Sequence, residues 1–170
     1  MVLVLMHAVV MTDYGQFTVT QGDGWDGDAD RFFAGQVNGW VAAAVPGVVH
    51  VVMARRSGGS GVRVELWDRA PAPSDWDDVV EVSATFQDGD AVRWEGWGGM
   101  SGGDLALPAV SYRVRVSAQG RDTGNADEFA EGVVDRYLLQ FWPAPTAPDE
   151  VLRTLSKDAE YWNGAWGQRR

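Results

Sequence analysis

The sequence contains no cysteine and only two histidines. Without cysteine the chain forms no disulfide, offers no thiol nucleophile and builds no cysteine-ligated zinc or iron–sulfur site. The absence of disulfides suits a reducing compartment, so we expect a cytoplasmic protein. His7 lies in an apolar N-terminal segment and His50 among valines, so a histidine-based catalytic triad would depend on His50 alone. These absences favour a protein that binds over one that catalyses, and we expect no cofactor.

Positive charge is also scarce. Lys157 is the only lysine, and 14 lysines and arginines together face 24 aspartates and glutamates, which leaves a net charge of −10. Proteins that bind nucleic acid or anionic membranes need clustered cations to displace counterions. We therefore expect no direct contact with nucleic acid or with a membrane. The charge suits a protein partner that is basic.

Long hydrophobic runs are missing as well. A membrane-spanning helix needs about 20 apolar residues in succession, and the apolar segment at residues 1–10 is shorter. It also lacks the basic start of a signal peptide. A second start-like sequence, Met11-Thr12-Asp13, follows directly. We interpret residues 1–10 either as an over-extended gene start or as a short extra strand, and residues 11–170 as one domain.

What the sequence does contain is a series of short segments that alternate between apolar and polar residues. Residues 111–118 place Tyr112, Val114 and Val116 on one face and two arginines on the other. Residues 48–54 and 62–67 are separated by a Gly-rich loop and predict a hairpin. We count about eight such strands, a pattern typical of a mainly β, antiparallel β-sandwich.

The C-terminal region predicts one helix, over about 149–163. Pro148 lies near its first position, and Asp149 and Glu150 suit the positive end of a helix dipole. The apolar residues that share one face of this helix are Val151, Leu152, Leu155, Ala159 and Trp162. That face predicts a helix docked on the sheet.

A first acidic loop joins aspartates to a tryptophan. It contains Asp23, Trp25, Asp26, Asp28 and Asp30. The last three have the opening spacing of an EF-hand, but Arg31 and Val37 occupy the positions that require glycine and glutamate, so that motif fails. A looser calcium site formed by Asp26, Asp28 and Asp30 is the weak metal candidate. The simpler interpretation is a solvated Asp/Gly turn, and we assign Asp23, Trp25 and Asp26 to a partner surface.

A second acidic tract contains Asp75, Trp76, Asp77 and Asp78, with no lysine or arginine between them. An exposed tryptophan ringed by carboxylates is typical of a binding hot spot for a basic partner. The alternative is that Trp76 packs beneath the loop and the acids are merely solvated. We assign these four residues to the partner surface.

Three short strand signatures carry a family resemblance. They are Tyr14-x-Gln16-Phe17-x-Val19, Tyr112-Arg113-Val114-Arg115 and Tyr137-Leu138-Leu139-Gln140-Phe141-Trp142-Pro143. With them the chain resembles a group of uncharacterised, chiefly actinobacterial proteins and, more distantly, the competence-protein J family of acidic inhibitors of a DNA-entry nuclease. The resemblance implies a β-sandwich that binds a partner protein such as a nuclease or toxin. It supplies no functional residue.

These observations lead to three hypotheses of function. The first is a non-enzymatic, acidic protein-binding module, such as a nuclease inhibitor or an immunity-type protein that acts on a basic partner. The second is a β-sandwich that binds calcium or carbohydrate, which would need exposed tryptophans and the Asp-rich loop. The third is a small enzyme of unknown type.

Overall fold

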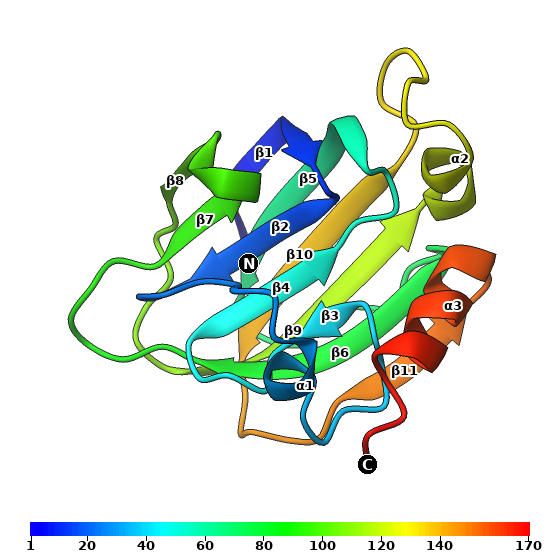
Figure 1. The fold of residues 1–170 in the computed structure, drawn as a ribbon. Helices are drawn as coiled ribbons and strands as arrows, with labels where there is room; N and C mark the ends of the chain where they lie inside the picture. Colours follow the sequence, from blue (N-terminus) through cyan, green and yellow to red (C-terminus); the bar gives the residue numbers. More distant parts are fainter.

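In a computed structural model that describes residues 1–170, two β-sheets face each other (Figure 1). One sheet contains β1 (Val2–Asp13), β5 (Ser57–Trp67), β6 (Asp78–Thr85), β9 (Ser111–Gln119), β10 (Arg136–Pro143) and β11 (Glu150–Thr154). The other contains β2 (Gln16–Thr20), β3 (Val41–Ala42), β4 (Val48–Val52), β7 (Arg93–Gly96) and β8 (Gly102–Asp104). The helices are α1 (Ala29–Phe32), α2 (Arg121–Ala126), α3 (Lys157–Ala165) and the 3₁₀ helix η1 (Trp97–Gly99). The predicted class, a mainly β sandwich with a C-terminal helix, is confirmed, with more strands than the sequence pattern showed.

The larger sheet is mixed rather than purely antiparallel. Its order is β1-β5-β10-β9-β6-β11. All neighbours are antiparallel except β5 and β10, which run parallel with Tyr137 opposite Val62. Alternation of apolar and polar residues identifies a strand but carries no information on its direction, so the sequence could not reveal this pair.

The predicted hairpin of residues 48–54 and 62–67 is wrong, because its two strands belong to different sheets. β4 pairs with β2 and β3, in a sheet of order β3-β4-β2-β7-β8. β5 pairs with β1 and β10 in the other sheet. Between them, the buried Arg55 donates to the carbonyl oxygens of Gly59 (2.9 Å) and Gly132 (2.6 Å), and these bonds fix the crossing from one sheet to the other.

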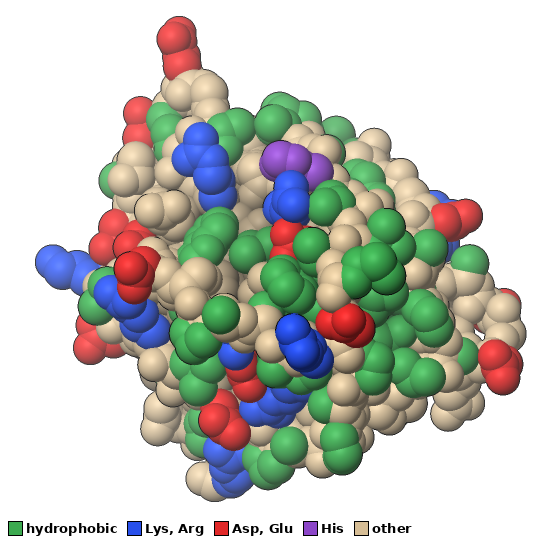
Figure 2. Space-filling model, turned by 180° about the vertical axis from the view of Figure 1, so that it is seen from behind, with side chains coloured by type: hydrophobic (Ala, Val, Ile, Leu, Met, Phe, Trp, Pro, Cys, Tyr) green, Lys and Arg blue, Asp and Glu red, His purple; other side chains and the backbone are tan.

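The core lies between the two sheets and contains 31 buried apolar residues. On β9, Tyr112, Val114 and Val116 are fully buried, as their alternation predicts. On the opposite face, the Nε atoms of Arg113 and Arg115 donate to Glu81 at 3.1 and 2.9 Å. Figure 2 shows this outer side of the molecule, where positive and negative side chains lie among apolar ones. Because Arg113, Arg115 and Glu81 pair with one another, their charges are not free to bind an external ion.

The C-terminal helix begins later than predicted. Residues 150–154 form β11, which pairs with the edge of β6, and α3 starts only at Lys157. Val151, Leu152 and Leu155, which the helical pattern assigned to the docked face, are exposed, whereas Ala159 is fully buried. The physical start signal is Ser156, whose hydroxyl accepts from the backbone N–H of Ala159 at 3.0 Å. Edge pairing with β6 outweighs the helical periodicity of residues 149–155.

Residues 1–10 form most of β1. β1 pairs with β5 from Val2 to Asp13. Val10 is buried in the core, while Val2, Leu3 and Val9 are exposed. None of the helices is both long and apolar enough to cross a membrane.

Docking of α3 requires a glycine at position 39. The backbone N–H of Gly39 donates to the side chain of Asn163 at 2.9 Å, and a Cβ atom added there would lie 1.8 Å from the carbonyl oxygen of Trp162. We expect Gly39→Ala to displace α3 and to lower the free energy of unfolding by about 1–3 kcal/mol. Urea denaturation followed by tryptophan fluorescence measures the change.

Gly164→Ala is the matched control on α3 itself. No atom lies within 4 Å of the Cβ position at Gly164, so alanine there is expected to be neutral or to stabilise the helix by about 0.5–1 kcal/mol. Equal denaturation midpoints for the two variants would contradict the proposed close approach.

Candidate functional site

A buried ion pair joins α2 to α3 at one end of the sandwich. Arg121 is completely buried, and its Nε and Nη2 atoms donate to Oδ2 of Asp158 at 3.0 and 2.6 Å. Its Nη1 atom donates to the carbonyl oxygen of Val52 at 2.8 Å, and its guanidinium lies over the rings of Trp40 and Tyr137. Burial raises the pKa of Asp158 above its ordinary value, and this outweighs the opposing effect of Arg121.

Two further carboxylates surround the start of α3. Asp122 accepts from the backbone N–H groups of Lys157 and Asp158 at 3.1 and 3.0 Å. Asp78 is fully buried, and its Oδ1 atom accepts from the backbone of Leu155 and Ser156. These bonds satisfy the N–H groups at the start of α3, and negative charge is favourable at a helix N-terminus. The charges of Asp122 and Asp78 also raise the pKa of Asp158.

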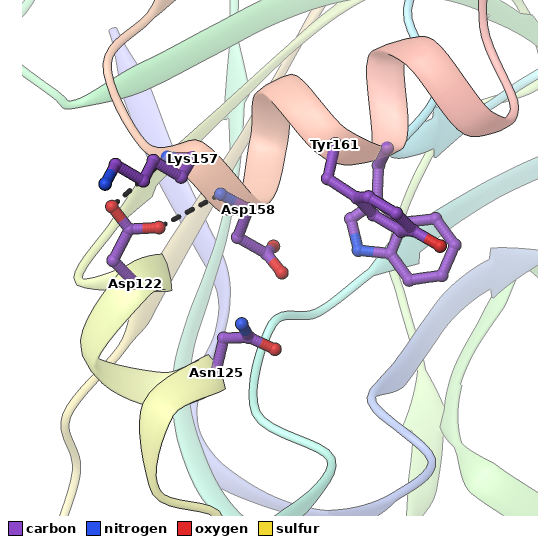
Figure 3. Close-up of a pocket in the computed structure, with 6 residues that line it drawn as sticks. Asp122, Asn125, Lys157, Asp158 and Tyr161 are labelled. Atoms are coloured by element: carbon purple, nitrogen blue, oxygen red, sulfur yellow. Dashed lines mark hydrogen bonds between the residues drawn. The ribbon is translucent and has the colours of Figure 1, made fainter.

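An open cleft of about 630 Å³ lies between α2 and α3 (Figure 3). It is lined by Asp122, Asn125, Lys157, Asp158, Tyr161 and Trp162. Figure 3 shows Asp158 and Asn125 pointing toward the same open space. A second cavity of about 260 Å³ shares Asn125, Asp158 and Trp162 with it. The two form one cleft, with a polar mouth and an inner part that we call the aromatic chamber.

The aromatic chamber is built from side chains far apart in the sequence. It is lined by Tyr14, Trp25, His50, Trp162 and Trp166, among others. The ring of Trp25 stacks on His50 with centroids 4.1 Å apart and planes within 4°. The Nδ1 atom of His50 is hydrogen bonded to the hydroxyl of Thr18 at 2.8 Å. Burial lowers the pKa of His50 to about 3, so its ring is neutral near pH 7.

Further acidic residues lie on or next to the two helices that border this cleft. We use the name acidic end for six carboxylate residues that lie before β6, on α2, in the loop that follows α2 and on α3: Asp77, Asp122, Asp127, Glu128, Glu131 and Glu160. Asp77 and Asp122 line a shallow hollow together. Two aromatic side chains stand out among these acids, with Phe129 83% and Tyr161 64% exposed. Such a surface combines negative charge with apolar anchors.

Comparison with solved structures identifies proteins that share this fold. No family model and no curated protein matches the chain. ComJ from Bacillus subtilis, an inhibitor of the DNA degrading activity of NucA, matches with a TM-score of 0.54 and 16% identity, over 85% of this chain and 99% of ComJ. The fold is ComJ-like. Crocagin biosynthetic protein J matches with a TM-score of 0.55 and 15% identity, over 85% of this chain and 99% of that one.

The ComJ-like fold confirms the distant resemblance to the competence-protein J family that the strand signatures indicated. At 16% identity this likeness establishes the fold alone and transfers no binding residue. The acidic end and the cleft are therefore described from this chain's own residues.

Within the ComJ-like sandwich, the second acidic tract divides into surface and interior. Asp75 is exposed and lies 3.7 Å from Arg153, and Trp76 is half-buried. Asp77 accepts from the backbone N–H of Gly120 at 3.3 Å and belongs to the acidic end. Asp78 is buried and caps the start of α3, so its assignment to a contact surface is wrong. The three residues before it remain candidates for partner contact.

The first acidic loop separates in the same way. Asp23 is exposed, whereas Trp25 turns inward and forms a wall of the aromatic chamber. Asp26, Asp28 and Asp30 do not converge on a common point: the first two pair with Arg31, and Asp30 pairs with Arg169 at 2.7 Å. No group of three potential metal ligands occurs in the chain. The weak calcium candidate is therefore not supported, because arginines already neutralise its carboxylates.

The basis for the carbohydrate hypothesis was exposed tryptophan. Of the nine tryptophans, only Trp97 is exposed, at 36%, and its ring packs 5.2 Å from that of Tyr14. No row of flat indole faces is presented to solvent. The structure therefore gives no specific support to a surface sugar site.

The sequence interpretation missed several residues of this site. Arg121 and Asp158 are 37 positions apart, and no motif links them. The acidic composition of residues 120–132 was a signal, because it surrounds the exposed Phe129 with carboxylates. Only the fold brings α2, which precedes this segment, next to α3, which carries Tyr161 (Figure 1).

Proposed function

We propose that this protein binds a basic protein through its acidic end and thereby inhibits a nuclease, without catalysing a reaction itself. The observation that carries the proposal is the acidic end itself, whose six carboxylates lie on or next to the segments that carry the exposed Phe129 and Tyr161. Aromatic side chains are common binding hot spots, and complementary charge speeds association and selects the partner. A nuclease suits this chemistry, because the cleft that binds its polyanionic substrate is basic.

The ComJ-like fold supports the same function. ComJ is an inhibitor of a DNA-degrading protein, and this chain covers 99% of it. The net charge of −10 disfavours binding to the DNA itself, so inhibition would act on the enzyme rather than on its substrate. An acidic surface that occupies a basic cleft competes directly with nucleic acid.

The acidic end can be tested by charge reversal in the loop after α2. Glu128→Lys/Glu131→Lys changes two side chains that make no hydrogen bond or ion pair, so the fold should be preserved. The protein and its variant are immobilised, and extract of the native host is passed over each at low salt. We expect the wild-type protein to deplete DNA-degrading activity from the extract. The double variant should bind the depleted nuclease at least roughly tenfold more weakly.

Asp88→Lys/Asp90→Lys is the matched control, because it makes the same change of net charge in a turn on another part of the surface. It should deplete the nuclease as well as the wild-type protein does. If the wild-type protein depletes no DNA-degrading activity, or if both double variants lose it equally, the proposed function is wrong. Inhibition is then measured as DNA cleavage by the captured enzyme with increasing amounts of the protein.

A further inference from the structure

The carboxylate of Asp158 has one oxygen engaged and one free. Both bonds from Arg121 reach Oδ2, and Oδ1 accepts no hydrogen bond from the protein. The residue is only 7% exposed, yet it lines both the mouth of the cleft and the aromatic chamber. Oδ1 of Asp158 is not among the buried side-chain oxygens that lack a partner, so it faces the open cleft, where a donor can reach it. The free oxygen therefore marks the place where a ligand donor would bind.

Aromatic rings form the walls next to this oxygen. Trp162 lines the passage between mouth and chamber, and Trp166 lies behind it with ring centroids 4.5 Å apart. The faces of such rings attract cations. The protein already uses this interaction nearby: the guanidinium carbon of Arg121 lies 4.7 Å from the centroid of Trp40, and that of Arg56 lies 5.1 Å from the centroid of Tyr14.

His50 does not add a positive charge to the aromatic chamber that would repel a cation. His50 is neutral near pH 7, and its Nε2 atom makes no hydrogen bond to the protein. Asp122 adds negative charge at the mouth. The cations at the rim are Lys157 and Arg56, both exposed, and the guanidinium of Arg56 is turned toward Tyr14.

We propose that the cleft receives an arginine side chain of the basic partner, with its guanidinium bound to Oδ1 of Asp158 and stacked on Trp162. This inference rests on the proposed function, since it names the partner residue that enters the acidic end. Arginine fits better than lysine because its planar guanidinium stacks on indole and binds carboxylates through several donors. Its apolar stem can lie along the exposed ring of Tyr161 and the half-buried ring of Trp162, which both line the mouth of the cleft.

The test needs no partner protein. N-acetyl-arginine N-methylamide is titrated into the full chain, and the indole N–H resonances of the nine tryptophans are followed by NMR. We expect shifts confined to Trp25, Trp162 and Trp166, assigned by single Trp→Phe variants. The neutral analogue, N-acetyl-citrulline N-methylamide, should bind at least roughly tenfold more weakly, because it cannot form the ion pair.

Variants separate a cation site from other ligands. Trp162→Leu should weaken binding of the arginine amide roughly tenfold. Arg56→Gln removes a positive charge from the rim and should strengthen it about threefold, whereas a ligand that is anionic would be weakened. Asp158→Asn should abolish binding, and because it disturbs Arg121 it is interpreted only if its thermal midpoint shows a folded protein. Asp88→Asn, outside the cleft, is the control and should change nothing.

Several results would overturn the inference. These are equal affinity for the arginine and citrulline amides, absence of shifts at the three cleft tryptophans, or weaker binding in Arg56→Gln. Tighter binding of free L-arginine than of the blocked amide would reassign the cleft to a small molecule. The nuclease-depletion experiment depends on Glu128 and Glu131, which lie outside the cleft lining, so failure of the proposed function and failure of this inference are distinguishable.

Discussion

Replacement of Arg121 by methionine is expected to lower the free energy of unfolding by about 3–5 kcal/mol, the cost of breaking a buried ion pair by removing one partner. Arg121 is completely buried and bonds both Asp158 and the carbonyl oxygen of Val52. Without it, Asp158 would keep a buried charge close to Asp78 and Asp122. No other arginine in the chain is as deeply enclosed.

Thermal unfolding and urea denaturation measure this loss. For a protein of 170 residues, a change of this size corresponds to a fall in Tm of roughly 6–20 °C. Arg136→Met is the matched control, because Arg136 is exposed and its side chain makes no hydrogen bond. The control should stay within about 0.5 kcal/mol of the wild-type protein.

A double-mutant cycle shows whether the pair itself is responsible. Arg121→Met/Asp158→Asn removes both charges, so neither is left buried without a partner. We expect the double variant to be more stable than the sum of the two single losses predicts, with a coupling of about 1–3 kcal/mol. Strict additivity would show that Arg121 acts through its bond to Val52 and its packing against Trp40 and Tyr137, and not through Asp158.

The sequence predicts the sandwich because alternation is a local property. Tyr112, Val114 and Val116 face the core as expected, and His50 lies buried on an interior strand. Direction and partner choice are not local: nothing in residues 57–67 indicates that β5 accepts β10 in parallel. The same limit explains β11, whose residues satisfy a helical period but are held by the edge of β6.

The site was predictable only in part, for the same reason. Charge density identified the acidic segments, and Asp77 accepts from the backbone N–H of Gly120, just before α2. Whether an aspartate is free to bind a partner depends on its neighbours in space. Asp78 accepts hydrogen bonds from the backbone at the start of α3, and Asp26 pairs with Arg31. The aromatic chamber joins Trp25 to Trp166, whose rings lie 5.7 Å apart although most of the chain separates them. The composition shows that acidic and aromatic residues are present, but only the fold shows which of them lie together.

Acidification should destabilise the protein through His50 well before most of its carboxylates are protonated. In the folded protein, burial lowers the pKa of His50 from 6.5 to about 3. An unfolded chain binds a proton at this residue below pH 6.5, whereas the folded protein does not. Stability is therefore fully present above pH 6.5 and falls as the pH drops toward 3, by roughly 4–5 kcal/mol in total.

Other groups titrate in part of this window, and their signs differ. The pKa of Asp158 is raised in the folded protein, so acidification relieves a cost there and opposes the effect of His50. The pKa of Glu65 is lowered, with hydrogen bonds from Arg63, Gln140 and Trp67 outweighing its partial burial, so its contribution is lost only below its ordinary value near 4.5. Comparison of two proteins that differ at residue 50 alone cancels both contributions.

His50→Asn provides that comparison, because asparagine is neutral at every pH and can still bond Thr18. The variant loses the stack on Trp25 and should be less stable than the wild-type protein at pH 8 by about 1–3 kcal/mol. The difference in the free energy of unfolding should shrink as the pH falls below 6.5 and change sign near pH 4. The reason is that only the wild-type protein must keep a histidine uncharged in order to fold. His7→Asn, at an exposed histidine, should follow the wild-type curve throughout. Parallel curves for His50→Asn and the wild-type protein between pH 8 and 4 would show that burial does not lower the pKa of His50. The aromatic chamber would then gain a positive charge below about pH 6.5, and arginine binding would weaken there.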